Sequence, residues 1–238
     1  MIDTHCHLLP RIDDGTRSPA EALALARQLV DAGVRAVVCT PHFSRRFPTA
    51  HGSARIRLKE LTAILAEAGV PLELELAAEV APGAAAEAST GDLTERRMGE
   101  THLLVELEPD TPAGFVEVAL ERLREISLTP IFAHPERCRA VRSQPRVLDA
   151  ARTAGALVQV VAPSLVGSWG GGAADAAWHL LESGRVDLLA SDAHRPRRQG
   201  THLAIAAPLV AARLGAEALT ELTERGPARI VGPALQAS

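Results

Sequence analysis

The chain has 238 residues, which suits one α/β domain of barrel size or two small ones, and its 47% hydrophobic content is ample for a core. A formal net charge of −4 gives no reason to expect nucleic acid or an acidic membrane as a partner. Three cysteines without a C-x-x-C pair, and no N-terminal basic segment followed by an apolar one, favour a reducing, cytoplasmic compartment over secretion.

Short β-branched segments alternate with helical patterns along the chain. After a first strand near the N-terminus, Ser18, Pro19 and Glu21 predict the start of a helix that ends at Gly33. Further strands are predicted at 35–40, 72–79, 102–107, 129–134, 156–161 and 186–191, with helices at 53–68, 113–126, 145–154, 173–183 and from about 201. This βαβ rhythm predicts parallel strands in one domain over residues 1–238, closed or nearly closed into a seven-unit barrel.

Residues 153–174 carry no charge and resemble a membrane span at first sight. They also contain Gln159, Pro163 and three consecutive glycines, 170–172, which break a helix. A strand and a loop are the better prediction, so we expect no membrane-embedded segment here.

Residues of metal-ligand type recur where the predicted strands end. Catalytic groups of such barrels lie at the C-terminal ends of the strands, so these side chains are expected to meet at one rim. The set comprises five histidines and four carboxylates: His5, His7, Asp14, His42, Glu79, Glu106, His134, Asp192 and His194. The sixth strand contributes no such group, and the other four histidines (His51, His102, His179, His202) fall outside the pattern.

Imidazole nitrogens and carboxylate oxygens without thiolates suit manganese, iron or zinc. Nine ligands exceed what one ion uses, so two or three divalent ions are expected. Cations that share a water molecule lower its pKa and hold hydroxide ready near neutral pH. Neighbouring ions also stabilise the oxygens of a phosphoryl group during in-line displacement.

Several arginines follow the expected ligands. Arg137 lies three residues after His134 in "HPERCR" (134–139), where a guanidinium can hold phosphate in a bidentate fork. The segments "HFSRR" (42–46) and "HRPRRQG" (194–200) place more arginines near the same rim. A cationic mouth for a phosphorylated ligand is one interpretation, and solvated loop charges are an equally good one.

The motifs together resemble a known family. They are "IDTHCHLLPRIDDG" (2–15), "TPH" (40–42), "AEV" (78–80), "LVELEP" (104–109), "AHPER" (133–137), "SLVG" (164–167) and "SDAH" (191–194). In this order they are similar to the polymerase and histidinol phosphatase (PHP) superfamily, and within it to bacterial manganese-dependent tyrosine-protein phosphatases of the CpsB/CapC type.

The resemblance implies a distorted seven-stranded barrel with a trinuclear manganese centre. One ion would bind His5, His7, Glu79 and Asp192; a second Glu79, Glu106 and His134; a third Asp14, His42 and His194. Arg137 would bind phosphate. The implied substrate is phosphotyrosine on the tail of a partner tyrosine autokinase, whose dephosphorylation regulates capsule or exopolysaccharide assembly.

The mechanism expected from these residues is in-line attack on phosphorus by a metal-bridging hydroxide. Arg137, His194 and Asp14 are the candidate catalytic residues, and His194 or an ion-bound water supplies the proton to the leaving group. No covalent intermediate is expected.

Three differences from the family pattern bear on this prediction. Cys6 replaces the usual serine between the first two histidines, and strand alternation should point it away from the ions. The loop after "TPH" is "FSRRFPTAHG" instead of an Asn- and Lys-rich segment, and "RPRRQG" replaces an Arg-Pro-Pro motif after "SDAH". The two loop differences leave the predicted metal centre intact but leave the substrate open.

Other functions remain compatible with the sequence. "CTPHFSR" (39–45) fits the C-x5-R loop of cysteine-dependent phosphatases, although Cys39 lies inside a predicted strand. An amidohydrolase would start with H-x-H too, but Lys59, the only lysine, falls in a predicted helix, where it cannot bridge metals. Histidinol phosphate or a nucleotide remains possible as substrate, as does a non-catalytic metal-binding module. The oligomeric state is open.

Overall fold

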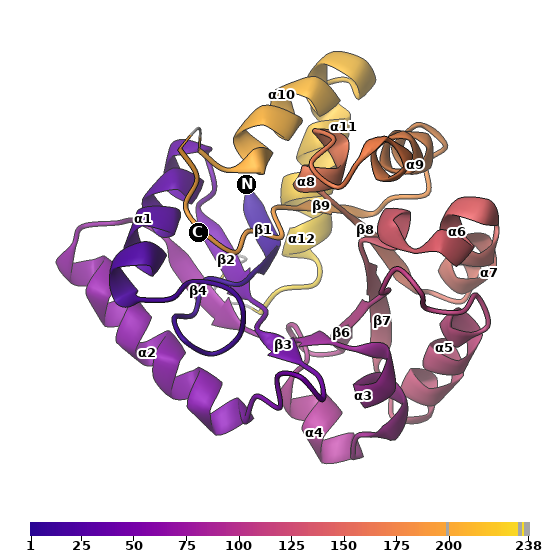
Figure 1. The fold of residues 1–238 in the computed structure, drawn as a ribbon, viewed down its shortest axis with the longest axis horizontal. Coiled ribbons are helices and arrows are strands. Elements are labelled where there is room, and N and C mark those ends of the chain that lie inside the picture. The colour runs from indigo at the N-terminus through magenta and orange to yellow at the C-terminus, as the bar shows by residue number, and fades with distance from the viewer. Residues whose placement is uncertain (199, 233–234, 236–238) are drawn as a thin grey trace.

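The strands of this computed structural model, which describes residues 1–198, 200–232 and 235, are all parallel and form two sheets. The first has the order β1 (Ile2–Cys6), β2 (Ala36–Cys39), β4 (Glu73–Leu76). The second has the order β3 (His42–Phe43), β5 (Glu79–Val80), β6 (His102–Glu106), β7 (Thr129–Ala133), β8 (Leu157–Val161), β9 (Leu188–Ala190). Figure 1 shows the strands around the middle of the molecule with the helices outside them.

Two of the predicted strands are each broken into two. The segment 35–40 and its continuation form β2 and β3, and the segment 72–79 forms β4 and β5. Pro41 lies at the first break, where it has no N–H to give to a sheet ladder. The backbone bonds from Ala77 N to Cys39 O (2.9 Å) and from Glu79 N to Pro41 O (3.2 Å) keep the two chains side by side across the breaks. The predicted parallel βα units are therefore confirmed, while closure into one barrel stays a prediction.

The first and last strands are also neighbours. Asp192 N donates to His5 O (2.9 Å) and His7 N donates to Ala193 O (2.9 Å), and Cys6 pairs with Ala193 in an isolated parallel bridge. Residues from opposite ends of the predicted ligand set are thereby held together by backbone hydrogen bonds.

Helices follow the strands as the sequence predicts, with extra short ones in the loops. They are α1 (Pro19–Asp31), α2 (His51–Glu67), α3 (Pro82–Glu87), α4 (Thr90–Glu95), α5 (Phe115–Glu125), α6 (Arg139–Ser143), α7 (Val147–Thr153), α8 (Ala162–Leu165), α9 (Gly171–Glu182), α10 (His202–Leu214), α11 (Ala216–Thr220) and α12 (Gly226–Ala228), with short non-α turns at Pro135–Arg137 and Glu221–Arg225. The charge-free segment 153–174 contains β8, α8 and the first residues of α9, so the predicted strand is confirmed but the predicted loop is partly helical, with Gly171 and Gly172 inside α9. No helix in the described part of the chain is long and apolar enough to span a membrane.

The start of α1 illustrates how local sequence sets a boundary. The Ser18 side chain accepts a hydrogen bond from Glu21 N (3.2 Å), as an N-cap residue does, and Pro19 follows it. The reciprocal contact differs from a capping box, because the Glu21 carboxylate accepts from Arg17 N (2.8 Å).

Alternation along the strands divides the core into two clusters. The outer cluster lies between strands and helices and includes Val37, Val105 and Phe132, whereas the inner cluster includes their neighbours Val38 and Leu104. Strand β1 breaks this alternation, since Ile2 belongs to the inner cluster and Cys6 to the outer one.

A register irregularity between Asp3 and Cys6 explains the change of face in β1. It leaves His5 and His7 directed at the rim while the Cys6 thiol packs away from it, donating to Ala193 O at 3.4 Å. The expectation that Cys6 would pack in the core is confirmed.

Phe132 is the largest side chain that is fully buried among the described residues, so its removal tests the outer cluster. We expect Phe132→Ala to lower the free energy of unfolding by about 3–5 kcal/mol, because lost burial and a residual cavity add together. Urea denaturation in the presence of chelator measures this. Val118→Ala on the exposed side of α5 is the control and should change stability by less than about 0.5 kcal/mol. A loss below about 1 kcal/mol for Phe132→Ala would contradict the packing described here.

Candidate metal centre

The structure brings all nine predicted ligand side chains to one rim. They form four overlapping groups in which the potential ligand atoms lie within 4.8 Å of one another. The groups are His7, Asp14, His42 and His194; His5, Glu79 and His134; His5, His7 and Asp192; His42, Glu79 and Glu106. Their convergence agrees with the sequence analysis, and metal binding by each residue stays a prediction.

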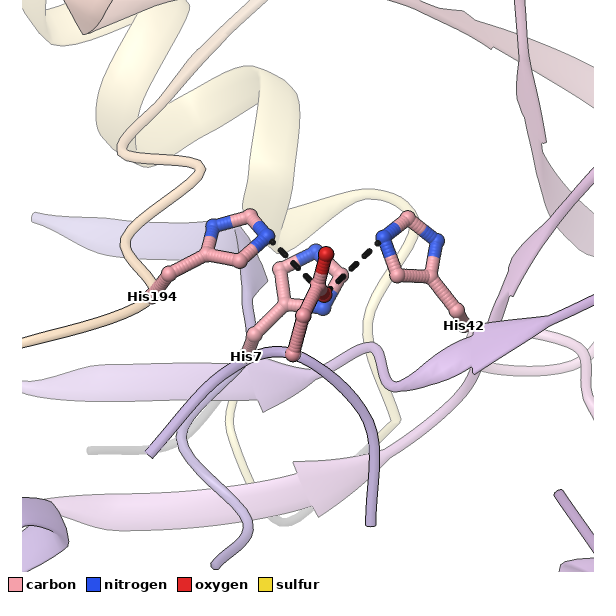
Figure 2. Close-up of side chains that lie close together, drawn as sticks. His7, His42 and His194 are labelled. Carbon is pink, nitrogen blue, oxygen red and sulfur yellow. Dashed lines mark ion pairs between the residues drawn. The ribbon is translucent and has the colours of Figure 1, made fainter. Parts of the chain in front are cut away.

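The first group centres on the Asp14 carboxylate. Its Oδ1 lies 3.4 Å from His42 Nε2 and 3.5 Å from His194 Nε2, the two ion pairs that are dashed in Figure 2. The His7 ring stacks on His194 with centroids 4.0 Å apart. The family resemblance implies Asp14, His42 and His194 as ligands of one ion, and the structure adds His7 to this group as a fourth candidate.

Glu79 belongs to two of the three remaining groups and is 1% exposed. Its Oε2 lies 3.3 Å from the Nε2 atoms of both His5 and His7 and 3.0 Å from His42 Nδ1, while Oε1 lies 2.8 Å from His134 Nε2. Glu106 groups with His42 and Glu79 instead of His134, which differs from the set implied for the second ion. Among the described residues, Glu79 is the carboxylate that belongs to two of the four groups, which makes it a candidate to bridge ions.

Two outer side chains fix the orientation of the first two histidines. Asp13 Oδ2 lies 2.8 Å from His7 Nδ1, and Gln159 Oε1 lies 2.9 Å from His5 Nδ1 while its amide donates to Thr4. Each partner accepts a hydrogen bond from Nδ1–H, so the neutral ring turns a lone pair on Nε2 toward the centre. The two Nε2 atoms face each other at 3.3 Å.

This donor set fits divalent cations. Two imidazole lone pairs and the carboxylates of Glu79 and Asp192 converge, a concentration of acceptors that requires positive charge between them. Asp14 Oδ1 and Asp192 Oδ2 are buried and, apart from ion-pair contacts of 3.4–3.6 Å, have no hydrogen-bond partner among the described residues, as expected of atoms reserved for an ion.

The ionisation of the site reflects the same demand. Burial alone would lower the pKa of His7, but its hydrogen bonds to Asp13 and Glu79 raise the pKa well above the usual value. Burial, reinforced by the Glu79 charge, raises the pKa of Glu106 to about 7. Positive charge, from protons or metal ions, is what these neighbours require.

Unusual backbone geometry aims two of the candidate ligands. His134 and Asp192 adopt left-handed conformations, with φ of 36° and 48°. Such strain costs about 1–3 kcal/mol per residue and is typical of functional sites. Backbone hydrogen bonds hold both residues, from His134 N to Gln159 O (2.8 Å) and from Asp192 N to His5 O (2.9 Å).

The loop that carries Asp13 and Asp14 packs tightly on β1. A Cβ atom at Gly15 would lie 2.2 Å from His7 O and 2.9 Å from Asp13 Oδ1, so only glycine fits. Asp13 also accepts from His42 N (3.0 Å) and Gly15 N (2.9 Å), which anchors the loop against the start of β3.

Arg137 enters the cavity above the centre. This cavity has a volume of about 270 Å³, and its walls include Ser44, Arg46, Phe47, Glu108 and Trp169. The Arg137 guanidinium lies 3.6 Å from Asp192 Oδ2 and 4.2 Å from the centre of the Trp169 ring. A larger cavity of about 600 Å³ borders α2 and β4, but none of the four ligand groups lies there.

The predicted arginine-rich mouth is found in part. Arg46 lines the cavity, whereas Arg45 points to solvent and pairs with Glu87. Arg195 and Arg197 line an adjoining cavity together with His202, one of the histidines expected to be ordinary. Residue 199 of the "RPRRQG" segment lies outside the described residues.

Sequence reasoning missed three residues of the site: Asp13, Gln159 and Trp169. Asp13 directly precedes the predicted ligand Asp14. Only their contacts show that Asp13 orients a histidine while Asp14 lies among the candidate ligands. Gln159 lies on the strand for which the sequence predicts no metal-ligand residue. Its alternation with the buried Val158 and Val160 is the signal that could have indicated its position on the inner face.

The two competing enzyme classes lose support from the geometry. Cys39 is fully buried in β2, and burial raises the pKa of its thiol far above the usual range, while Arg45 of the C-x5-R motif faces solvent. A thiolate nucleophile is therefore excluded there. Lys59 lies on the exposed side of α2, away from the four ligand groups.

Comparison with known proteins gives consistent matches over nearly the whole chain. A family model described as capsular polysaccharide synthesis, CpsB/CapC, matches residues 1–232. The tyrosine-protein phosphatase YwqE of Bacillus subtilis is 29% identical over 229 residues, which cover 94% of this chain and 89% of that protein. The tyrosine-protein phosphatase CpsB of Streptococcus pneumoniae is 24% identical over 242 residues, which cover 97% and 98%.

Solved structures agree. A crystal structure from work on YwqE of B. subtilis and CpsB of S. pneumoniae, described as metal-dependent tyrosine phosphatases, matches with a TM-score of 0.82 and 27% identity over 95% of this chain and 92% of that one. Dihydropyrimidinase from Brevibacillus agri matches with a TM-score of 0.59 and 13% identity over 95% of this chain and 69% of that one, which shows a shared fold alone.

Asp13 offers a test of the centre that leaves every candidate ligand in place. In Asp13→Asn an amide N–H must face either Gly15 N–H or the two donors from His7 and His42, so either the loop that positions residue 13 or the His7 ring itself loses a hydrogen bond that fixes it. We expect Mn²⁺ affinity to fall by about 10–100-fold in isothermal titration. Asp31→Asn, an exposed change on α1, is the control and should bind as the unaltered protein does. Unchanged affinity in Asp13→Asn would show that Asp13 does not orient a ligand.

Proposed function

We propose, from the premise that this chain belongs to the capsular polysaccharide synthesis CpsB/CapC family, that it is a metal-dependent protein-tyrosine phosphatase. Its substrate would be phosphotyrosine on the tail of a bacterial tyrosine autokinase, and its role would be the regulation of capsule or exopolysaccharide assembly. The observation that carries the proposal is the convergence of nine N- and O-ligand side chains beneath a cavity that Arg137 enters.

The nine residues would hold two or three ions, for which we infer Mn²⁺ because the donors are imidazoles and carboxylates without thiolates. When bound, such cations supply an activated water and neutralise charge on the phosphoryl oxygens. Glu79 would bridge ions at the buried floor, and Asp14, His42 and His194 would complete the more exposed part of the centre.

Arg137 would orient the phosphoryl group. Its side chain is 22% exposed and stays near Asp192 and Trp169, so the guanidinium is held at the cavity wall with donors free for two phosphate oxygens. It would stabilise the charge that develops on those oxygens in the transition state.

The leaving group needs little acid assistance, since a tyrosine phenolate has a reference pKa of about 10. His194, whose side chain is 31% exposed at the cavity and whose Nε2 is paired with Asp14, would deliver a proton only while that nitrogen holds no ion, and water in the cavity would supply the proton otherwise. Asp14 would then act both as a ligand and as the group that orients His194.

Three finer features belong to the same proposal. We infer that the two sheets act as one distorted seven-unit barrel, since β2 continues into β3, β4 into β5, and β1 adjoins β9. Three free buried cysteines support a reducing, cytoplasmic location. The oligomeric state stays open.

Chelation tests the metal requirement. Protein stripped with EDTA should not hydrolyse a phosphotyrosine peptide, and Mn²⁺ should restore hydrolysis better than Zn²⁺ or Mg²⁺. Cys39→Ala should keep full activity, because that thiol lies away from the centre and takes no part.

Full hydrolysis in EDTA would end the proposal. Faster hydrolysis of histidinol phosphate than of the peptide would show that the substrate is a small phosphomonoester instead of a phosphotyrosine protein. Tight Mn²⁺ binding without turnover of either compound would indicate a non-catalytic metal-binding module.

Arg137→Ala tests the phosphate-binding role. We expect kcat to fall by about 10²-fold, the loss typical of one transition-state donor, with metal content unchanged by elemental analysis. Arg139→Ala is the matched control, two residues further on, where the side chain is exposed and paired with Asp110. Equal kinetics for the two variants would remove Arg137 from the site.

A further inference from the structure

A second cavity adjoins the candidate centre and has no role in the function proposed so far. It has a volume of about 400 Å³ and shares Asp14, Trp169, Asp192 and His194 with the cavity that Arg137 enters. The shared carboxylates and His194 belong to the ligand groups, so the two cavities meet at the proposed metal centre. A substrate whose phosphoryl group lies at this junction must place its leaving group in one cavity or the other.

The two cavities differ in chemistry. The first contains the carboxylates of Glu79, Glu106 and Glu108 together with Arg46 and Arg137. The second has apolar surface from Pro163, Trp169 and Ala193, and its rim carries Arg195 and Arg197. An apolar ring gives up the smallest amount of solvation free energy by moving from water into the second cavity, whereas the first would favour the charged phosphoryl group once cations balance its carboxylates.

Trp169 is presented to the junction by a well-bonded turn. Gly167 and Gly170 flank it with φ of 76° and 86°, and Gly170 N donates to Gly167 O (3.1 Å). Ser168 N donates to Pro163 O (2.9 Å), and the Ser168 hydroxyl lies 2.9 Å from His202 Nε2 at the start of α10. The turn is therefore fixed on both sides, although Trp169 itself is 48% exposed.

An exposed indole on a rigid turn is unusual, because a large aromatic side chain is normally buried. The other tryptophan, Trp178, follows that rule: it is partly buried and donates to Leu165 O at 3.2 Å. The Arg137 guanidinium lies against the Trp169 ring, which leaves the rest of the indole surface to the second cavity.

We propose that the second cavity is the leaving-group subsite and that Trp169 is its specificity-determining residue, selecting aryl over alkyl phosphoesters by contact with the ring. The proposal rests on the phosphatase function proposed above. It places the phosphoryl group at Arg137 and the aryl group of the same substrate against Trp169. Because Trp169 also contacts the Arg137 guanidinium, its side chain adjoins both parts of the substrate. Arg195 and Arg197 would favour acidic residues beside the phosphotyrosine.

The test compares two phosphoesters whose leaving groups have similar acidity, phenyl phosphate and hexafluoroisopropyl phosphate. Trp169→Ala should lower kcat/KM for phenyl phosphate by roughly five- to tenfold more than for the alkyl ester, the difference expected for one lost aromatic contact, because any loss of support for Arg137 affects both esters equally. Trp169→Phe should restore most of the difference. Ile205→Ala, which truncates another exposed apolar side chain, should alter neither substrate.

Binding gives a readout that does not depend on turnover. The chain has two tryptophans and no tyrosine, so in Trp178→Phe the indole fluorescence reports Trp169 alone. Phenylphosphonate should change this emission with a saturable dependence, and ethylphosphonate should bind more weakly with a smaller change.

Three results would overturn the inference. An equal loss on both esters in Trp169→Ala, with an equal rise in the inhibition constant of inorganic phosphate, would mean that Trp169 only supports Arg137. If phenylphosphonate inhibits the enzyme but leaves the Trp169 emission unchanged, the phenyl ring of the ligand does not bind against Trp169. Failure of the unaltered, manganese-loaded protein to hydrolyse either ester would overturn the phosphatase function itself, and the inference with it.

Discussion

The arrangement depends on one electrostatic constraint, the convergence of proton acceptors on a small volume. His5 Nε2 and His7 Nε2 face each other at 3.3 Å, and both lie 3.3 Å from the same Glu79 oxygen. Asp13 and Gln159 act from outside, because each accepts a hydrogen bond from an Nδ1–H group, which leaves the Nε2 lone pairs directed inward. Such a cluster of carboxylates and imidazole lone pairs is unstable without positive charge between its members. The surrounding fold must therefore hold the side chains together until cations or protons balance their negative charge.

Backbone hydrogen bonds between distant segments provide that support. His134 and Asp192 reach the centre only in left-handed conformations, and each is tied to a neighbouring strand by its own N–H, on Gln159 O and His5 O. The irregularity in β1 serves the same end, since it turns His5 and His7 to the rim while Cys6 packs outward. The strain of the site is thus offset by the pairing of parallel strands, which also brings residues 5 and 192 side by side.

Sequence reasoning predicted what depends on pattern and missed what depends on contact. Hydrophobic periodicity located the strands, and the rule that parallel strands present their C-terminal ends together placed the nine ligand-type residues at one rim. It could not separate Asp13 from Asp14, because adjacent carboxylates on a loop differ only in which partners they meet. The breaks after β2 and β4 and the position of Trp169 were missed for the same reason: they follow from Pro41, from flanking glycines and from tertiary packing, none of which has a period.

Charge balance couples phosphate binding to the state of the centre. Glu79, Glu106, Asp14 and Asp192 line the cavity that a phosphoryl group must enter, and Arg46 and Arg137 are the arginines among its described lining residues. Two guanidinium groups cannot offset several carboxylates and an incoming dianion at a few ångströms, where like charges repel strongly in a partly buried site. Phosphate affinity must therefore come mainly from the cations that the carboxylates retain. It follows that the carboxylates, which by themselves would repel the substrate, become the reason it binds once the metal sites are filled.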